Sequence, residues 1–583
     1  MVGLDNPEEI KRDFQSDDTN EVIQTHLKRD PTLDIQDRSK ETEPSGILER
    51  ETELEFVKLS TKKLLLIGSA TTIVWFQGVA YICGTGYLLP VIQKEFQISL
   101  GDVQWVTAAF NITWGCFALV AGRIGDIYGL DRTFIFGLSF YAIWVLIGGF
   151  MPNIIGLSMT QSLSGIGFAI ASPAAAAMIG TYFPSGKPKT IAFSVMAGAG
   201  AIGAGLGWLL GGFFTISSPY TWRCLMFLCS SLTLYPIIIA ILVFPRSPGH
   251  PRDKKVDWIG ASMITSAQVL LGLSLTFPVA TKKGWKAPYI PVLFILSAIL
   301  FISFIFRQFY LDKRETNPAY PPPLTPARLF GHRRPMVVIY LSTFFVWMGS
   351  DSLGVTASYF YEDVLGLSGW QAGLRVLPSV AGGVMGSIMV GILLHYLPSR
   401  AVLVLTDCIG GSAGIIFAAR PMNRAYWKAD LWAWLTTSVA SDGTTAVAST
   451  LISDYTSSAD QGVANALLVS CMRFGAMMGL ALSTITREGV QHSKEASFRH
   501  SLSLDSTTLL DWTMEQIAEW EGVKSAFFFC GASVLTAAAI VGIGLKGWYV
   551  VGRPTSNEVI GPTSGTSSAS SQKLKMGTSE VKV

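Results

Sequence analysis

The stretch Ala121–Arg132, AGRIGDIYGLDR, is a short charged segment between two long apolar runs. About a dozen residues are enough to connect two membrane helices on one side of a bilayer, but too few to form a domain. Gly122 and Gly129 let the backbone turn tightly, while Arg123 and Asp126 place opposite charges where moving helix ends exchange partners. The stretch therefore predicts a gating loop between two spanning helices.

The composition around this loop is that of a polytopic membrane protein. Of the 583 residues, 50% are hydrophobic and only 15% are charged, whereas soluble proteins carry about 25% charged residues. The mean hydropathy is +0.41. A net charge of +3 is too small to indicate a nucleic-acid partner. The composition indicates a lipid bilayer as the partner instead.

Sequence patterns for catalysis and metal binding are not found. The seven cysteines all fall inside apolar runs and none forms a C-x-x-C pair, so we expect buried thiols rather than a zinc or redox site. A phosphate-binding G-x-x-x-x-G-K-[ST] pattern is missing as well, which disfavours ATP-driven transport. We therefore expect no enzyme, no metal and no cofactor.

Apolar runs fill the chain between two polar tails. Residues 1–62 and 553–583 are too polar to bury a core and are predicted to be disordered. About fourteen runs between them approach the roughly 20 residues of a spanning helix. Their approximate limits are 63–90, 103–121, 133–151, 154–180, 190–214, 222–244, 257–278, 288–309, 336–357, 370–395, 400–419, 430–452, 462–485 and 524–548. An even number places both tails on one side.

Lysines and arginines in the short loops indicate which side this is. Most of them fall in loops on the side of the tails, which is therefore predicted to be cytoplasmic. Basic residues on the opposite side break the rule without reversing it, namely Lys282, Lys283, Lys286, Arg420, Arg424 and Lys428. The only long external loop is predicted at residues 488–523, with a short amphipathic helix inside it.

An internal repeat divides the runs into two groups of six. The segment Gly391–Arg400, GILLHYLPSR, occupies in the second group the place of the gating loop, and His395 falls where Asp126 does. The predicted parts are a bundle at 63–245, two linker helices with a cytoplasmic loop at 246–335, and a bundle at 336–552. Paired bundles with a site between them are a transporter architecture, and one chain suffices for it, so we expect a monomer.

Several motifs carry a resemblance to a known family. The spacing G-x-x-x-D-x-x-G resembles the loop between the second and third helices of the major facilitator superfamily, although Arg132 alone remains of its usual basic residues. TWRCLMF from Thr221, KVDWIGA from Lys255 and QGVANALLVSCMRFGAMMGLAL from Gln461 resemble helices six, seven and thirteen of the fourteen-span drug:proton antiporters. The chain is most similar to fungal aminotriazole-resistance-like transporters.

This resemblance implies an all-α polytopic membrane protein with the major facilitator fold: two six-helix bundles plus two extra central helices, fourteen transmembrane helices in all. It also implies efflux of a small organic molecule, driven by the proton gradient. The plasma membrane is the expected location, with the vacuolar membrane as the alternative and both termini cytoplasmic.

The glycine-rich run from Gly198, GAGAIGAGLGWLLGGFF, resembles the fifth-helix signature of proton-coupled antiporters. The matching positions are Gly203, Gly207, Gly211 and Gly212. Small residues at this spacing form a groove into which another helix packs closely, so a plain packing role stays open beside a role in coupling. Trp208 replaces the proline of the signature, which removes the expected cause of a kink.

Two further departures concern proton coupling. Gln161 stands where the family pattern has arginine, and Tyr81 stands where related sequences often carry aspartate. Neither side chain titrates near neutral pH, so the family's proton-handling roles do not transfer to them.

Other ionisable residues inside the runs are therefore the candidates for proton coupling. A charge at a helix centre costs about 2.5–3.5 kcal/mol on insertion scales, so such residues usually face the bundle interior or a water-filled cavity. Asp442 is the first candidate, followed by Asp351 and by Arg473, for which pairing with an acid is an equal alternative. We expect Arg375 to reach the interface and Asp407 to be structural.

Aromatic and amide side chains are candidates for a substrate cavity. Gln77 and Tyr81 lie four residues apart on one helix face, and Trp75 points away from that face and is the weaker candidate. Trp347 and Tyr359 flank Asp351, and Gln161 is included as the partner position in the fourth run. Packing and interfacial anchoring are the commoner uses of such rings, but they also suit a cavity for weakly basic or amphipathic compounds.

Three functions stay open from the sequence. The first is a proton-coupled exporter of a drug, toxin or secondary metabolite that works by alternating access. The second is a facilitator or low-affinity transporter of a small inorganic solute such as ammonium or borate, which the atypical coupling positions favour. The third is a transport-deficient membrane sensor.

Overall fold

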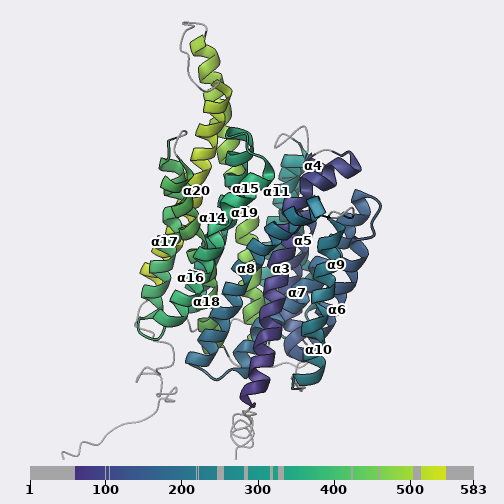
Figure 1. Ribbon diagram of the computed structural model, residues 1–583. Helices are drawn as coiled ribbons and strands as arrows, with labels where there is room; N and C mark the ends of the chain where they lie inside the picture. Colours follow the sequence, from purple (N-terminus) through teal and green to yellow (C-terminus); the bar gives the residue numbers. More distant parts are fainter. Residues whose placement is uncertain are drawn as a thin grey trace, which may run out of the picture. The chain divides into compact units, whose positions relative to one another are not determined.

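The computed structural model describes residues 59–98, 100–103, 105–217, 220, 222–245, 255–280, 287–314, 320–325, 334–421, 425–456, 460–502 and 514–545. Of the predicted tails, residues 1–58 and 553–583 lie outside these residues. Within them every regular element is a helix (Figure 1). The longer ones are α3 Thr61–Phe96, α5 Trp105–Tyr128, α6 Leu130–Gly148, α7 Ile154–Tyr182, α8 Lys187–Ser217, α9 Arg223–Leu232, α10 Leu234–Val243, α11 Trp258–Ala280, α12 Tyr289–Asp312, α14 Arg334–Tyr359, α15 Gly369–Val376, α16 Pro378–Leu393, α17 Ser399–Ala419, α18 Asp430–Tyr455, α19 Gln461–Leu502 and α20 Met514–Gly544.

Thirteen spans within the described residues are long and apolar enough to cross a membrane. The helix pair α9 and α10 counts as one of them, as does the pair α15 and α16. The predicted run 430–452 forms α18, which has 26 residues but carries many Ser, Thr and Asp side chains and is not among the thirteen. Because α18 is surrounded by α8, α14, α16 and α17, it needs no apolar face toward lipid. Together with the thirteen spans, α18 accounts for the fourteen predicted helices.

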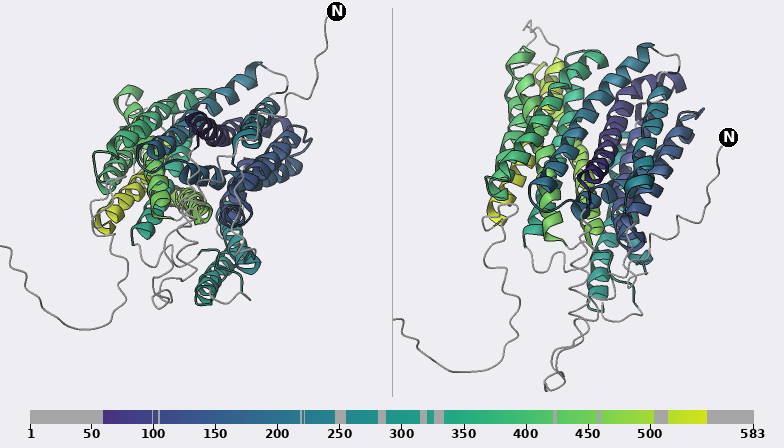
Figure 2. Two further views of the ribbon diagram at one scale, coloured as in Figure 1. Left: turned by 90° about the horizontal axis from the view of Figure 1, so that it is seen from below. Right: turned by 60° about the horizontal axis from the view of Figure 1, so that its bottom comes forward.

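The helices pack in two groups. In the first group α3 packs on α8, and α7 lies between α5 and α6. In the second group α17 packs on α18 and α20, and α14 on α19 and α20. Figure 2 shows the first group in purple to blue and the second in green to yellow. The groups meet where α5 packs on α19 and α8 on α16 and α18.

The linker helices α11 and α12 form a separate pair beside these groups. They pack on each other, and α11 also contacts α5 and α19. Only 17% of the spanning window of α12 is buried, against 83% for α7. The pair is thus central in the sequence, while α12 presents most of its apolar surface outward.

The predicted gating loop is almost entirely helical, which corrects our boundaries. Helix α5 continues to Tyr128 and α6 begins at Leu130, so Gly129 alone separates them. Its φ of 102° lies in a region that side-chain-bearing residues rarely adopt. Glycine at this position therefore permits the whole reversal of direction in one residue.

The prediction of a long external loop at residues 488–523 was wrong over most of its length. Helix α19 continues to Leu502, past the ends of its neighbours (Figure 1), and α20 begins at Met514. Trp520 explains the early start of α20, because its buried ring lies 5.0 Å from the ring of Phe360 and anchors this end of the helix. Polarity indicated a loop, but long polar helices also project from membranes.

For the description of sites, the end of the bundle at which α3 begins is called the tail end, and the opposite end is called the far end. The chain reverses at every span, so α5, α7 and α18 finish at the tail end and α8, α14 and α19 start there.

Candidate functional site

Arg473 lies between the two groups, held between two tryptophan rings. Its guanidinium carbon is 4.0 Å from the ring centre of Trp114 on α5 and 4.7 Å from that of Trp347 on α14. Each ring is fixed by its own N–H, since Trp114 donates to the Ser172 hydroxyl at 2.9 Å and Trp347 donates to the Thr445 hydroxyl at 3.1 Å. Cation–π contacts thus join the first group to the second through one arginine.

Asp351 faces this arginine from α14. Its Oδ2 is 3.9 Å from Nη1 of Arg473, at the outer limit of an ion pair. The Asp351 side chain is 41% exposed although it lies inside a spanning helix, whereas that of Arg473 is 7% exposed. One turn further toward the far end, a Cβ added to Gly354 would meet no atom within 4 Å. The carboxylate therefore borders an open space within the bundle.

Asp442 lies on α18 at the seam between the groups. A Cβ added to Gly383 of α16 would collide with the Asp442 carboxylate and with the methyl group of Ala201 on α8. No hydrogen bond or ion pair to Asp442 is found among the described residues, and Asp351 is the ionisable neighbour that acts on it by charge. An uncompensated carboxyl at this depth is costly. The structure thus places all three proton-coupling candidates in one region.

Tyr81 and Gln161 form a neutral pair inside the first group. The Tyr81 hydroxyl donates to Oε1 of Gln161 at 3.0 Å, and both side chains are buried. The Tyr81 ring packs on Phe110 and Tyr141, with ring centres 5.6 and 5.9 Å apart. A cavity of about 10 Å³ beside the pair has room for about one water molecule. A hydrogen bond between uncharged groups therefore occupies the two positions at which the family carries charges.

The remaining candidates for the substrate cavity, Trp75, Gln77 and Tyr359, lie in different parts of the structure. Trp75, the weaker candidate by helix-face geometry, packs on Trp114 at 6.2 Å and so extends the aromatic cluster around Arg473. Gln77 is fully buried, and its carboxamide has no hydrogen-bond partner among the described residues. Tyr359 lies under the guanidinium of Arg487 at 3.9 Å, at the far end. Of these three, only Trp75 adjoins the cluster of Trp114, Trp347, Arg473 and Asp351, which is called the central cluster below.

The predicted glycine groove is a packing surface for α3. A Cβ added to Gly203 would collide with the carbonyl oxygen of Phe76, and one added to Gly207 with that of Ala80. A Cβ on Gly211 would lie 3.1 Å from the Tyr87 ring, and Gly212 also belongs to α8. The helix runs unbroken through the half-buried Trp208. The packing interpretation is confirmed, and the role in coupling stays a prediction.

Asp126 joins the groups at the tail end. Its Oδ1 accepts from the backbone N–H of Gly462 at 2.8 Å, and its Oδ2 accepts from that of Val463 at 2.9 Å. These amides open α19, so the carboxylate also meets the positive end of a helix dipole. Gly122 allows the approach, because a Cβ there would collide with Ala466.

The other polar members of the predicted gating loop differ in exposure. Arg123 is buried and its charge acts on Asp126, whereas Arg132 is exposed. In the second group His395, the counterpart of Asp126, lies just after α16 with its Nε2 buried and without a hydrogen-bond partner in the described residues.

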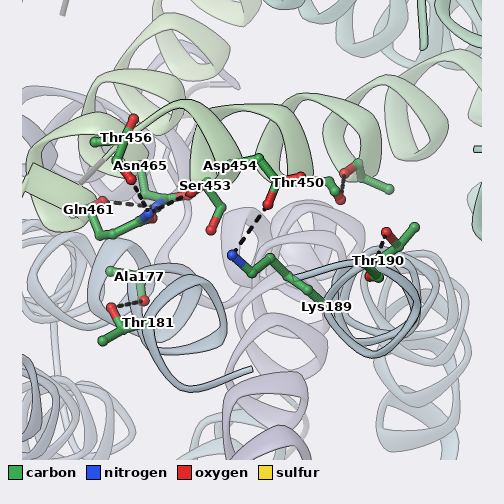
Figure 3. Close-up of polar contacts among 12 residues, drawn as sticks. Ala177, Thr181, Lys189, Thr190, Thr450, Ser453, Asp454, Thr456, Gln461 and Asn465 are labelled. Carbon is green, nitrogen blue, oxygen red and sulfur yellow. Dashed lines mark hydrogen bonds and ion pairs between the residues drawn. The ribbon is translucent and has the colours of Figure 1, made fainter. Parts of the chain in front are cut away.

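A second set of contacts closes the tail end beside Asp126. Lys189 of α8 and Asp454 of α18 form an ion pair at 3.3 Å across the groups (Figure 3). In the same view Gln461 donates to the carbonyl oxygens of Ser453 at 2.8 Å and Thr456 at 3.0 Å, which ties α19 to α18. The groups are therefore joined at the tail end by the Lys189–Asp454 ion pair and by the contacts of Asp126.

Lys189→Ala is expected to loosen this closure. A partly buried ion pair contributes about 1 kcal/mol, which corresponds to about a fivefold shift between closed and open forms. The measurement is the rate at which maleimide labels a cysteine placed at position 453 by Ser453→Cys. Ser453 is 3% exposed, and the rate is compared with and without Lys189→Ala. Exposed Lys187, two residues away, is the matched control, and Lys187→Ala should leave the rate unchanged. Equal rates in both variants would show that the ion pair does not hold the closed form.

Known proteins place this architecture in a family. Residues 69–480 match the Major Facilitator Superfamily. The aminotriazole resistance protein of Saccharomyces cerevisiae is 24% identical over 68% of this chain and 72% of its own length. The low affinity ammonium transporter of the same yeast is 25% identical, and the efflux pump terJ of Aspergillus terreus is 26% identical; each alignment covers 68% of this chain and 76% of the relative.

A solved structure agrees with the fold. The human organic anion transporter MFSD10 superposes with a TM-score of 0.57 over 82% of this chain and 99% of its own, at 13% sequence identity. The predicted fold is thereby confirmed, and so is the resemblance to fungal transporters of this kind. The chain belongs to the Major Facilitator Superfamily and is a multi-pass membrane transporter of that family.

Proposed function

We propose that the protein exports a small organic compound in exchange for protons by alternating access. The observation that carries this proposal is Asp442, a carboxyl at the seam of the two groups that lacks a partner in the described residues and lies within reach of the charge of Asp351. A carboxyl in this position is less costly when it holds a proton. Separation of α8 from α16 and α18 would expose the Asp442 carboxyl to water on one side of the membrane. A proton-coupled carrier requires such a change in the access of its proton site to water.

The central cluster suits an organic substrate. Trp75, Trp114 and Trp347 present ring surface beside a cation, Arg473, and a half-exposed anion, Asp351. A flat weakly basic compound would stack on these rings and pair with Asp351, because the existing ion pair of 3.9 Å is weak. The relatives named for aminotriazole resistance and for efflux support export as the direction.

A second function is supported by a different observation. The neutral Tyr81–Gln161 pair leaves the first group without the charged residues that its family uses there, and one relative is named a low affinity ammonium transporter. Both favour passage of a small inorganic solute such as ammonium or borate without proton exchange. The open space beside Asp351 would then serve as a simple vestibule.

Three features of the proposal concern the whole molecule. The proton gradient supplies the energy and no cofactor takes part. A monomer suffices, because both groups belong to one chain. The plasma membrane is the proposed location, with the tail end on the cytoplasmic side.

Proton release from the purified full-length protein tests this function. Cationic, neutral and acidic compounds are added in weakly buffered detergent solution, and the pH is recorded. Release on addition of at least one compound is expected, and the same compound should move into inverted vesicles only when a proton gradient is imposed. Flux of ammonium that is indifferent to the gradient, with no release for any compound, would reject antiport in favour of the facilitator.

A further inference from the structure

A second cavity lies beside a different face of α19 from the one that carries Arg473. It has a volume of about 200 Å³ and is bounded by α11, α12 and α19. Phe294 and Phe301 of α12 and Phe474 and Met478 of α19 form most of its apolar wall. Phe294 is 46% exposed and Phe301 is 41% exposed, so the cavity borders the outer surface of membrane-spanning helices.

One polar side chain in this wall lacks a partner. Gln268 of α11 is only 8% exposed, and its Oε1 has no hydrogen bond among the described residues. The neighbouring hydroxyl of Ser297 does not serve it, because that hydroxyl donates to the carbonyl oxygen of Ala267 at 2.7 Å. A buried acceptor left unpaired costs about 1–3 kcal/mol, so a bound donor would relieve a real penalty.

The cavity is separate from the cluster of tryptophan rings around Arg473. Arg473 points to Trp114 and Trp347, whereas Phe474, the next residue along α19, lines the cavity. Successive residues of a helix point about 100° apart, so α19 is the wall between the two spaces. Helix α11 closes the other side: a Cβ on its Gly272 would lie 3.0 Å from Met477 and 3.1 Å from Ile112.

We propose that this cavity binds a neutral aromatic molecule that carries one hydroxyl or N–H and enters from the membrane. None of the lining residues is charged, which excludes an ion as the preferred ligand. A dry apolar cavity of about 150 Å³ accepts benzene, so this cavity fits a somewhat larger ring system. Phenylalanine faces and the methionine sulfur favour a flat ring over a hydrocarbon chain.

The hydrogen bond to Gln268 separates this ligand from a lipid tail. An acyl chain fills apolar volume but brings no donor, so it would leave Oε1 of Gln268 unpaired. A hydroxyl on the ring pairs with that oxygen and fixes the orientation of the molecule. The ligand would bridge α11, α12 and α19, and therefore joins the linker pair to the helix that carries Arg473.

Equilibrium dialysis of 2-naphthol against the full-length protein in phosphatidylcholine nanodiscs tests the proposal. We expect saturable binding above that of empty nanodiscs. Gln268→Leu should weaken 2-naphthol binding about fivefold, the effect of one hydrogen bond of about 1 kcal/mol. Naphthalene, the same ring without a donor, should bind the wild type and this variant equally. Because Gln268→Leu removes an unpaired polar group, its thermal stability should not fall.

Two further variants locate the binding. Ala298→Trp places a large ring at the exposed, lipid-facing side of the cavity and should abolish binding of both compounds. Asp442→Asn, in the central region, should bind 2-naphthol like the wild type. The proposal is overturned if wild-type binding does not exceed that of empty nanodiscs, or if Gln268→Leu leaves 2-naphthol affinity unchanged. It is equally overturned if Asp442→Asn abolishes binding while Ala298→Trp does not.

Discussion

Asp442→Asn is expected to reduce substrate-induced proton release to the level of protein-free detergent. The carboxyl lies where α16, α18 and α8 meet, with small residues against it and no counter-cation in the described part of the chain. Asparagine has nearly the same shape and mimics the protonated acid, but it binds no proton. The variant should therefore fold, and it should carry substrate down its own gradient without a response to the proton gradient.

Asp407→Asn is the matched control for this experiment. Asp407, a fully buried carboxyl on α17, accepts from the Thr444 hydroxyl at 2.5 Å and the Ser342 hydroxyl at 3.4 Å, whereas Asp442 is half-buried. Its partners all belong to the second group, so motion between the groups does not change its access to water. Proton release should persist in Asp407→Asn.

The comparison with Asp351→Asn then assigns the proton site. Asp351 already borders the open space and pairs weakly with Arg473. If Asp442 is the site, Asp351→Asn should weaken the affinity for a cationic substrate and keep proton release. Loss of release in Asp351→Asn with full release in Asp442→Asn would move the proton site to Asp351.

The sequence predicted most of the helices because spanning a bilayer imposes a length and an apolar composition on each of them. It placed their ends less well. Gly129 forms the turn alone, because its positive φ lets the chain reverse direction in one residue. The residues on both sides of it are helical, but their charges had suggested a loop. The same polarity hid the extension of α19 to Leu502. Polarity marks the water boundary, not the helix end.

The candidate site was predictable only in part. Ionisable residues within apolar runs are conspicuous, because placing a charge inside the membrane costs free energy. Asp442, Asp351 and Arg473 were therefore identifiable from the sequence. Trp114 was not, because a tryptophan inside an apolar run looks like any core residue, and only packing brings it to Arg473. The link from Asp126 to Gly462 uses backbone amides, which leave no mark in the sequence. Contacts between groups are set by how the groups meet, not by local patterns.

Arg420 shows how such contacts also mislead the charge rule. It was counted among the basic residues on the outer side, but its side chain is 2% exposed and pairs with Asp430, which is fully buried, at 3.2 Å. The guanidinium also lies 4.7 Å from the ring centre of Phe360. Arg420 thus has a structural use at the far end, where the charge rule does not favour a basic residue. It stays an exception to that rule, and the orientation stays a prediction.

Arg420→Met is consequently expected to lower the free energy of unfolding by about 3–5 kcal/mol, the usual cost of leaving one member of a buried ion pair alone. The stranded Asp430 would keep the Tyr361 hydroxyl, which donates to it at 3.2 Å, and Trp434 in turn donates to that hydroxyl at 3.0 Å. The measurement is equilibrium unfolding of the full-length protein in mixed micelles. Exposed Lys428 on the same side is the control, and Lys428→Met should change stability by less than about 0.5 kcal/mol.

The double variant decides whether the pair itself or the stranded charge is responsible. Replacing both partners, as Arg420→Met with Asp430→Leu, removes the buried charges together, and such replacements are often neutral or stabilising. The double variant should therefore recover most of the stability that Arg420→Met loses. If it is as unstable as the single variant, the network around Tyr361 depends on the carboxylate of Asp430 as an acceptor, and the loss comes from broken hydrogen bonds rather than from an uncompensated charge.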